Sequence, residues 1–339
     1  MRAVLTILWD SLQLLRARML FWVVIWISVL VGLLYASIGF DQDGISMLFG
    51  ISSFENPLMA DPSLQRLTYL LLFTNFISPW WLGFFAVLLS LIASCSVFPE
   101  LMREGSIENI LSKPIPRWKI FIVKYIGILG FMALPLTLFC LIVFFAMGLR
   151  VGVWSPRIFL AVPLLTFVFS ILYSFAVLVG VWTRSTLFAL LSAVLLYGTC
   201  YLVHFTESLF YALAIQAPAA GQEVNLGEPE PIYHDEPLDP VGGLVAFYDG
   251  LRKTTWLLPK PRKATLYLKQ LLLYEDELDE IAGIDLLSLM TGQRPDRLIK
   301  KAQAAGESRM EGSEIFLPSI LFQAVCLGGA CWIFQRRDF

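Results

Sequence analysis

The chain has 339 residues, of which 57% are hydrophobic and only 15% are charged, and its mean hydropathy is +0.71. Soluble domains average roughly 45–50% apolar and about 25% charged residues, so this composition argues against a soluble globular protein and indicates lipid as the solvent for much of the chain. The net charge of −2 and the lack of a basic block argue against nucleic-acid binding.

The first predicted element is an amphipathic helix over residues 1–18. Its apolar side chains recur at helical spacing, at Val4, Ile7, Leu8, Leu12 and Leu15. Such a helix can continue directly into the first membrane span, or it can lie in the membrane interface as an elbow. The pattern does not separate these two interpretations.

Six stretches are long and apolar enough to cross a bilayer, which takes about 20 residues of helix. We expect an all-α integral membrane protein, with spans 1–5 inside residues 19–212 and span 6 followed by a tail in residues 315–339. The predicted spans are Met19–Phe40, Phe76–Phe98, Ile120–Met147, Phe159–Trp182, Leu187–Leu213 and Ile315–Phe334.

The distribution of Lys and Arg predicts the orientation, because short cytoplasmic loops are enriched in these residues. With a cytoplasmic N-terminus, eleven basic residues fall on the inner side and three on the outer side. Both termini are therefore predicted to face the cytoplasm and residues 213–314 to lie outside. The inner residues are Arg2, Arg16, Arg18, Arg103, Lys113, Arg117, Lys119, Lys124, Arg184, Arg336 and Arg337, and the outer ones are Arg66, Arg150 and Arg157.

The connection between spans 2 and 3, residues 99–117, is predicted to contain a short cytoplasmic helix. Pro99 suits a first helical turn, and Glu100 would lie near the positive end of the helix dipole. Lys113 would lie at the negative end, and Pro114 cannot continue the helix. A charged helix with an apolar stripe is typical of a docking element, although the same pattern also suits a solvated loop.

This connection resembles the cytoplasmic coupling segment of the ABC type-2 permease family. That segment has acidic residues before a Gly-Ser/Thr pair, then Leu-Leu-Ser-x-Pro, Arg, and a Lys in the next span. Residues 333–339 also resemble the C-terminus usual in that family, whereas the long acidic segment 213–314 departs from its compact members. The matching residues are Glu100, Glu104, Gly105, Ser106, Leu111, Ser112, Pro114, Arg117 and Lys124, with Arg103 and Glu108 inside the same segment.

The resemblance implies the transmembrane subunit of an ATP-driven transporter in the plasma (inner) membrane, exporting an unidentified substrate. Two permease subunits, identical or different, would form the path, and separate ATPase subunits carrying ATP and Mg would dock on residues 99–117. The sequence itself contains no Gly-x4-Gly-Lys-Ser/Thr loop to hold a nucleotide phosphate. We therefore expect no catalytic residue, no metal and no bound cofactor in this chain.

His204 and Glu207 are the exceptional ionisable residues inside the predicted spans. They are three residues apart in span 5 and share one helix face. An intramembrane carboxylate is a candidate functional group. Because both residues lie near the outer end of the span, we prefer an interfacial polar pair to a site.

The predicted outer segment, residues 213–314, carries a net charge of −6. Residues 217–243 are rich in Pro, Gly and acid and predict a flexible linker, whose acidic cluster we interpret as solvated. Residues 261–282 and 295–305 show helical patterns, so a small helical cap is expected.

Two other classes of function remain open at this stage. The chain could be a non-catalytic scaffold that presents its outer segment to a partner, in which case no ATPase subunit would bind. It could also be a polytopic enzyme acting on lipid, although the sequence offers no ordered cluster of acids and histidines at a membrane face.

Overall fold

The computed structural model describes most of the predicted membrane part and pieces of the outer segment. Residues 1–18 and 103–115 lie outside the described part, so the amphipathic helix and the centre of the predicted coupling helix stay predictions. The described residues are 19–41, 44–47, 51–55, 62–102, 116–152, 154–216, 222–223, 232–233, 242–256, 258–272 and 312–336.

Six helical elements in the described residues are long and apolar enough to cross a membrane, which confirms the predicted membrane fold. Each predicted span lies on one of them, and the ends differ by up to about two helical turns. The candidate spans are Met19–Ala36, Thr68–Leu101, Arg117–Arg150, Pro156–Thr183, Thr186–Ala214 and Ile315–Arg336. They are built from α2 (Met19–Ala36), α3 (Pro62–Leu71) continuing into the π-helix η3 (Leu72–Ala86), α4 (Val87–Ser94) and α5 (Val97–Leu101), α7 (Arg117–Arg150), the 3-10 helix η4 (Pro156–Leu160) with α8 (Ala161–Thr183), α9 (Thr186–Tyr211) with the π-helix η5 (Ala212–Gln216), and α16 (Gly312–Arg336).

Short strands and helices outside the spans were not all predicted. Between α2 and α3, β1 (Gly39–Asp41), β2 (Gly44–Met47) and β3 (Ser52–Glu55) form an antiparallel sheet. In the outer segment β4 (Gln222–Glu223) pairs with β5 (Ile232–Tyr233), and α11 (Gly242–Thr254) follows, where a linker was expected as far as residue 243. The predicted helix at 261–282 is present as α12 (Pro261–Leu272), and its remainder lies outside the described residues.

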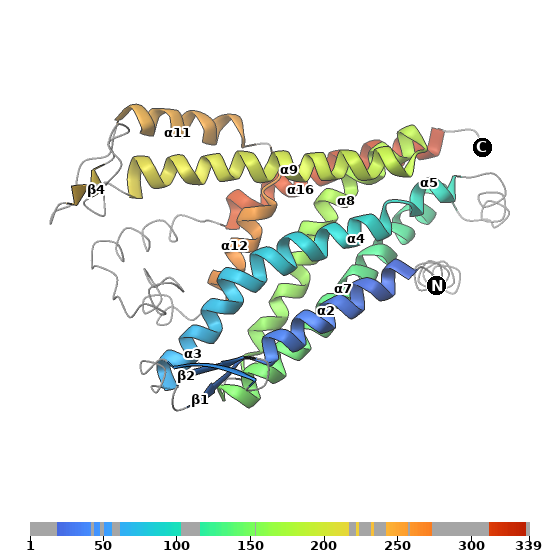
Figure 1. Cartoon of the computed structure of the whole chain (residues 1–339). Helices are drawn as coiled ribbons and strands as arrows, with labels where there is room; N and C mark the ends of the chain where they lie inside the picture. The colour runs from blue at the N-terminus through green and yellow to red at the C-terminus, as the bar shows by residue number, and fades with distance from the viewer. Residues whose placement is uncertain are drawn as a thin grey trace.

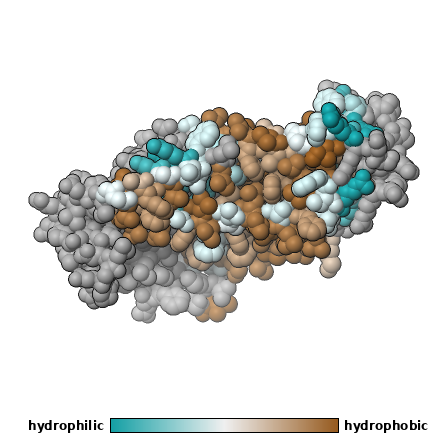
Figure 2. Space-filling model, turned by 90° about the horizontal axis from the view of Figure 1, so that it is seen from above, coloured by the Kyte–Doolittle hydropathy of each residue, from teal (hydrophilic) through white to brown (hydrophobic). Residues whose placement is uncertain are grey.

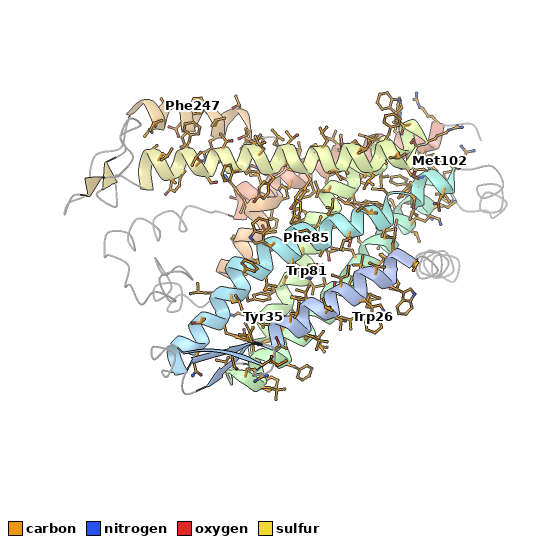
Figure 3. All side chains as sticks on the ribbon, viewed as in Figure 1. Trp26, Tyr35, Trp81, Phe85, Met102 and Phe247 are labelled. Atoms are coloured by element: carbon orange, nitrogen blue, oxygen red, sulfur yellow. The ribbon has the colours of Figure 1, made fainter. Side chains whose placement is uncertain are left out.

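The helix α8 forms the centre of the bundle. It packs against α7, α9 and α16, and 72% of its most apolar stretch is buried, against 22% for α9. Figure 2 shows a broad apolar band between two more polar ends of the molecule. An apolar side chain on the outside of such a band faces lipid: Trp26 on α2 is 69% exposed and points away from the bundle (Figure 3).

One end of the bundle, which we name the α5 end, brings together the starts of α2 and α7 and the end of α16 (Figure 1). Arg117 donates a hydrogen bond from Nη1 to the Gln335 carbonyl at 3.3 Å, and the rings of Phe121 and Phe334 lie 5.9 Å apart. The C-terminal end of the 99–117 connection therefore lies where spans 3 and 6 meet.

The turn between α8 and α9 is the shortest connection between spans. Only Arg184 and Ser185 separate the two helices, and Arg184 has φ 54° in the left-handed region, which lets α8 end abruptly. The Gly180 position one turn earlier is also crowded: a Cβ there would lie 3.2 Å from Ala189 Cβ and 3.3 Å from Pro99 Cγ. Spans 4 and 5 therefore form a tight helical hairpin against α5.

The opposite end, which we name the α12 end, is formed by α3, η4, α11 and α12. There α11 packs along α9, and α12 crosses to pack against η3, α8 and α9 (Figure 1). Ala264 and Leu268 of α12 are fully buried in this contact. We name the pair α11–α12 the outer hairpin; it is part of the bundle rather than a separate domain.

Candidate functional site

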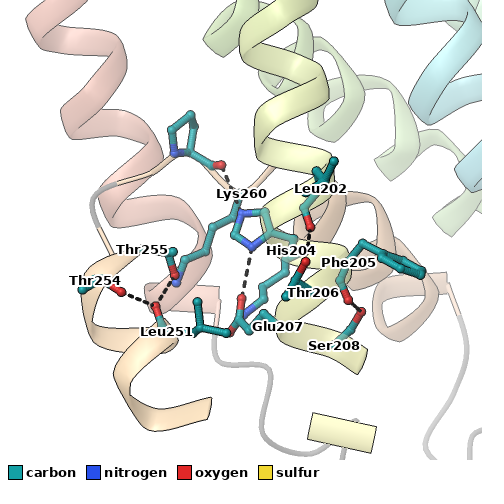
Figure 4. Close-up of polar contacts among 12 residues, drawn as sticks. Leu202, His204, Phe205, Thr206, Glu207, Ser208, Leu251, Thr254, Thr255 and Lys260 are labelled. Atoms are coloured by element: carbon teal, nitrogen blue, oxygen red, sulfur yellow. Dashed lines mark hydrogen bonds and ion pairs between the residues drawn. The ribbon is translucent and has the colours of Figure 1, made fainter. Parts of the chain in front are cut away.

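A buried charged cluster lies where the outer hairpin meets spans 5 and 6 (Figure 4). Its first two members are His204 and Glu207, which α9 places one turn apart on its inner face. They are 2% and 3% exposed, so both side chains are buried inside the protein. The spacing predicted the shared face, but not the burial.

Glu207 is the centre of the cluster. Its Oε2 lies 3.1 Å from His204 Nδ1, and its Oε1 accepts a hydrogen bond from Lys263 Nζ of α12 at 2.5 Å. One carboxylate therefore joins a span to the outer hairpin. Ion pairs of this kind are strong only when both oxygens are satisfied, as they are here.

The turn between α11 and α12 supplies the remaining contacts. His204 Nε2 lies 3.2 Å from the Pro259 carbonyl, and the Lys260 amide donates to Ser319 Oγ of α16 at 3.3 Å. The Lys260 side chain is 3% exposed and extends toward the end of α11 near Thr255 (Figure 4). A cation at a helix C-terminus is favoured by the helix dipole.

The contacts of His204 determine where protons lie. A carbonyl oxygen only accepts, so Nε2 donates to Pro259. The Nδ1–Oε2 contact with Glu207 is a hydrogen bond only when one proton lies between these two atoms, on the imidazolium or on the carboxyl group. The Glu207 carboxyl group thus shares a proton with His204 at one oxygen and contacts the Lys263 ammonium at the other.

Sequence reasoning missed Lys260 and Lys263 because both are distant from span 5 along the chain. The sequence signal that could have found them is the pair of lysines at the start of an amphipathic helix facing an intramembrane Glu. A buried carboxylate needs a cationic partner, and these two lysines lie beside the predicted apolar face of the helix at 261–282.

The predicted coupling segment is only partly described. Arg103, Glu104, Gly105, Ser106, Glu108, Leu111, Ser112 and Pro114 all lie outside the described residues. Glu100 is described and lies in α5, which is helical from Val97 to Leu101 rather than beginning at Pro99. Arg117 is described and begins α7.

The described flank of this segment is firmly packed. Phe98 is 1% exposed, with its ring 5.0 Å from Phe121 and 6.4 Å from Tyr173. Leu101 and Met102 are also buried, and Met102 marks the last described residue before the gap (Figure 3). Any displacement of the segment would therefore be transmitted to spans 3 and 4.

A second polar group, in the middle of the bundle, was not predicted. Tyr125 donates to the Ser170 carbonyl at 2.8 Å and accepts from Gln323 Nε2 at 3.2 Å, and Ser170 Oγ donates to Gln323 Oε1 at 3.2 Å. These bonds tie spans 3, 4 and 6 together. Every member has a partner inside the group, so we interpret it as structural.

Within the described residues, no group of three or more His, Cys, Asp or Glu side chains is placed to hold a metal ion. The five cysteines, all described, are free thiols, four of them buried, which agrees with their interpretation as small apolar side chains.

No family model matches the sequence, and neither the search of curated proteins nor the search of solved structures finds a significant match. The comparisons therefore identify no family, and the resemblance to ABC type-2 permeases rests on the residues quoted above. The sequence and the structure together establish a multi-pass helical membrane protein with six candidate spans.

Proposed function

We propose that this chain is the transmembrane permease subunit of an ATP-binding-cassette transporter, which exports a substrate across the plasma (inner) membrane. A separate ATPase subunit would dock on residues 99–117, and a second permease subunit, identical or different, would complete the path. Both termini would face the cytoplasm.

One observation carries the proposal: the segment that resembles a coupling helix is anchored at both ends in the bundle. At its start, Phe98 packs on Tyr173 and Phe121; at its end, Arg117 donates to the Gln335 carbonyl. A docking element transmits force only when its ends are fixed. Fixed ends would let the segment pass the movement of a docked partner to spans 3, 4 and 6, as the docking interpretation requires.

The α5 end is also the end that the distribution of positive charge places inside. The starts of α2, α7 and α9 and the end of α16 lie on the predicted cytoplasmic side, together with Arg117, Arg184 and Arg336. A cytoplasmic ATPase would meet the molecule here. Because the chain has no phosphate-binding loop of the Gly-x4-Gly-Lys-Ser/Thr kind, ATP and Mg would bind to that partner.

The first experiment purifies the tagged chain from native membranes and identifies its partners by mass spectrometry. We expect a co-purifying chain that contains a Walker-type phosphate loop, and ATP hydrolysis only when that chain is present. Robust hydrolysis by the permease alone, or no ATPase among its partners, would contradict the proposal and favour the scaffold interpretation.

The second experiment reverses two charges of the segment, Glu104→Lys and Glu108→Lys together. Repulsion against a complementary surface weakens docking more than loss of one exposed charge, which is worth under about 1 kcal/mol. We expect normal membrane insertion with loss of ATPase co-purification or of stimulated hydrolysis.

The matched control carries Glu228→Lys and Glu230→Lys in the outer segment, where no ATPase can bind under this topology. This variant should keep the partner and its activity. Unchanged partner binding and hydrolysis in the Glu104→Lys, Glu108→Lys variant would refute the assignment of the coupling segment.

Orientation is tested separately with Gly227→Cys in a background whose five native cysteines are replaced by alanine. An impermeant maleimide should label this residue in intact cells. Labelling only after lysis would place residues 213–314 inside and reverse the topology.

A further inference from the structure

We infer that the outer hairpin is a separable lid, and that the charged cluster centred on Glu207 is the latch that holds it in the bundle. The inference does not depend on the transport function, since it concerns only how the hairpin is held.

The two helices of the hairpin contact the bundle to different extents. None of the residues of α11, all of which are described, is fully buried. In α12, Ala264 and Leu268 are buried, and Thr265 approaches span 2 closely: a Cβ added to Gly83 would lie 2.9 Å from Thr265 Cγ2 and 3.5 Å from Thr265 Cβ. A helix without a fully buried side chain, such as α11, opens at low cost in free energy, so α12 and the turn before it must hold the hairpin in place.

The polar contacts of the hairpin are concentrated at the turn between α11 and α12 and at the start of α12, where they join it to spans 5 and 6. Lys263 binds Glu207 of α9, the Pro259 carbonyl accepts from His204, and the Lys260 amide donates to Ser319 of α16. Burial of a single unpaired charge at this position would be costly, so the cluster is stable only when hairpin and spans are together. Removing Glu207 takes the carboxylate partner away from Lys263 and from His204 Nδ1.

Of the two hairpin helices, α12 begins next to the Glu207 cluster and also packs deepest against the spans. The contacts of α12 with η3, α8, α9 and η4 bring four elements from spans 2, 4 and 5 together around one short helix. Release of the latch would therefore expose the side chains of α12 that face these spans.

The experiment measures how often the hairpin leaves the bundle. Thr265→Cys is introduced as the sole cysteine, because Thr265 is only 8% exposed in the closed position. The rate of maleimide labelling in detergent is then proportional to the open population. We expect Glu207→Gln to raise this rate at least about tenfold, which corresponds to about 1.4 kcal/mol of lost latch energy.

Two controls separate release of the lid from other effects. Asp249→Asn makes the same chemical change at an exposed position of α11 and should leave the labelling rate unchanged. Native Cys140, kept as the sole cysteine in a parallel preparation, is fully buried in α7 and should stay protected in Glu207→Gln, because only general unfolding would expose it.

A disulfide fixes the closed position independently. A Cβ built on Gly83 lies 3.5 Å from Thr265 Cβ, which is within the range that a disulfide requires, so Gly83→Cys and Thr265→Cys can be combined. This cysteine pair should cross-link on mild oxidation. In a separate variant with Thr265→Cys as the sole cysteine, exchanging the two charges (Glu207→Lys with Lys263→Glu) should restore slow labelling. An unchanged labelling rate in Glu207→Gln, or equal exposure of Cys140, would overturn the inference.

Discussion

The two ends of the bundle are held together by different interactions. At the α5 end, Phe98, Phe121 and Tyr173 pack ring against ring, and Gly180 allows Pro99 to approach α8 closely. At the α12 end, buried polar ties are added to the packing: the Glu207 cluster, and the reciprocal pair in which Tyr35 and Tyr69 each donate to the other's backbone carbonyl. The first end is held mainly by ring packing, and the second combines packing with specific buried polar bonds.

This difference bears on which end can move. Lipid tails are as apolar as the side chains, so apolar packing between spans depends on close contact and is lost gradually as helices separate. A charged cluster in a low-dielectric site is lost almost completely once its partners separate. The α5 end is suited to transmit motion, and the α12 end is suited to switch between two states.

The largest expected effect tests the packing of the α5 end. Phe98→Ala removes a fully buried ring that contacts two others, and such truncations cost about 4 kcal/mol. Thermal unfolding in detergent should show a clear loss of stability. Trp26→Ala, at a side chain that is 69% exposed, is the control and should be close to neutral. Equal effects of the two changes would mean that Phe98 is not part of a packed core.

The next effect tests the cluster at the α12 end. Glu207→Leu leaves Lys263 and His204 without their counter-charge and should destabilise the protein by about 3 kcal/mol. Adding Lys263→Met should recover most of this loss, because replacing both members of a buried pair by apolar side chains is often neutral. Additive losses in the double variant, measured by chemical unfolding, would show that the two residues do not interact.

A smaller effect tests the close approach between α5, α8 and α9. Gly180→Val adds a Cβ that lies 3.2 Å from Ala189 and 3.3 Å from Pro99, with two further methyl groups, and overpacking of this kind costs about 2 kcal/mol. Gly198→Val in α9 is the control, since a Cβ there meets nothing within 4 Å. The comparison fails if both variants have the same melting temperature.

The smallest effect tests the tyrosine pair. Tyr69→Phe removes one hydrogen bond, the one that Tyr69 donates to the Tyr35 carbonyl, and hydrogen bonds between spans are worth about 0.6–1 kcal/mol. Tyr35→Phe should have a similar effect, and the double variant about the sum. A loss comparable with that of Phe98→Ala would remove the contrast between the two ends.

The six spans could be predicted from sequence because lipid imposes one strong rule: long apolar runs become helices. Their ends were less certain, as in span 2, where α3, η3, α4 and α5 extend well beyond the predicted Phe76–Phe98. The three-stranded sheet escaped prediction because strands of three or four residues carry almost no periodic signal.

The candidate site was only half predictable. The spacing of His204 and Glu207 placed them on one face, since helical periodicity is a local property. Their burial and their partner Lys263 depend on where the outer hairpin folds back, which is a contact across 56 residues of chain. For residues 99–117, the pattern was visible in the sequence, whereas the ring packing of Phe98 and the hydrogen bond of Arg117 are visible only in the structure.

The two-residue turn at Arg184 also has a consequence for biosynthesis. Spans 4 and 5 are too closely joined for α9 to cross the bilayer without α8, so we expect the two helices to leave the translocon together as one hairpin. In the orientation proposed above, Arg184 at the tip would stay on the side of the ribosome and fix the direction of insertion. The central helix of the bundle and its most lipid-exposed neighbour would thus enter the membrane in a single step, before the outer hairpin and span 6 are made.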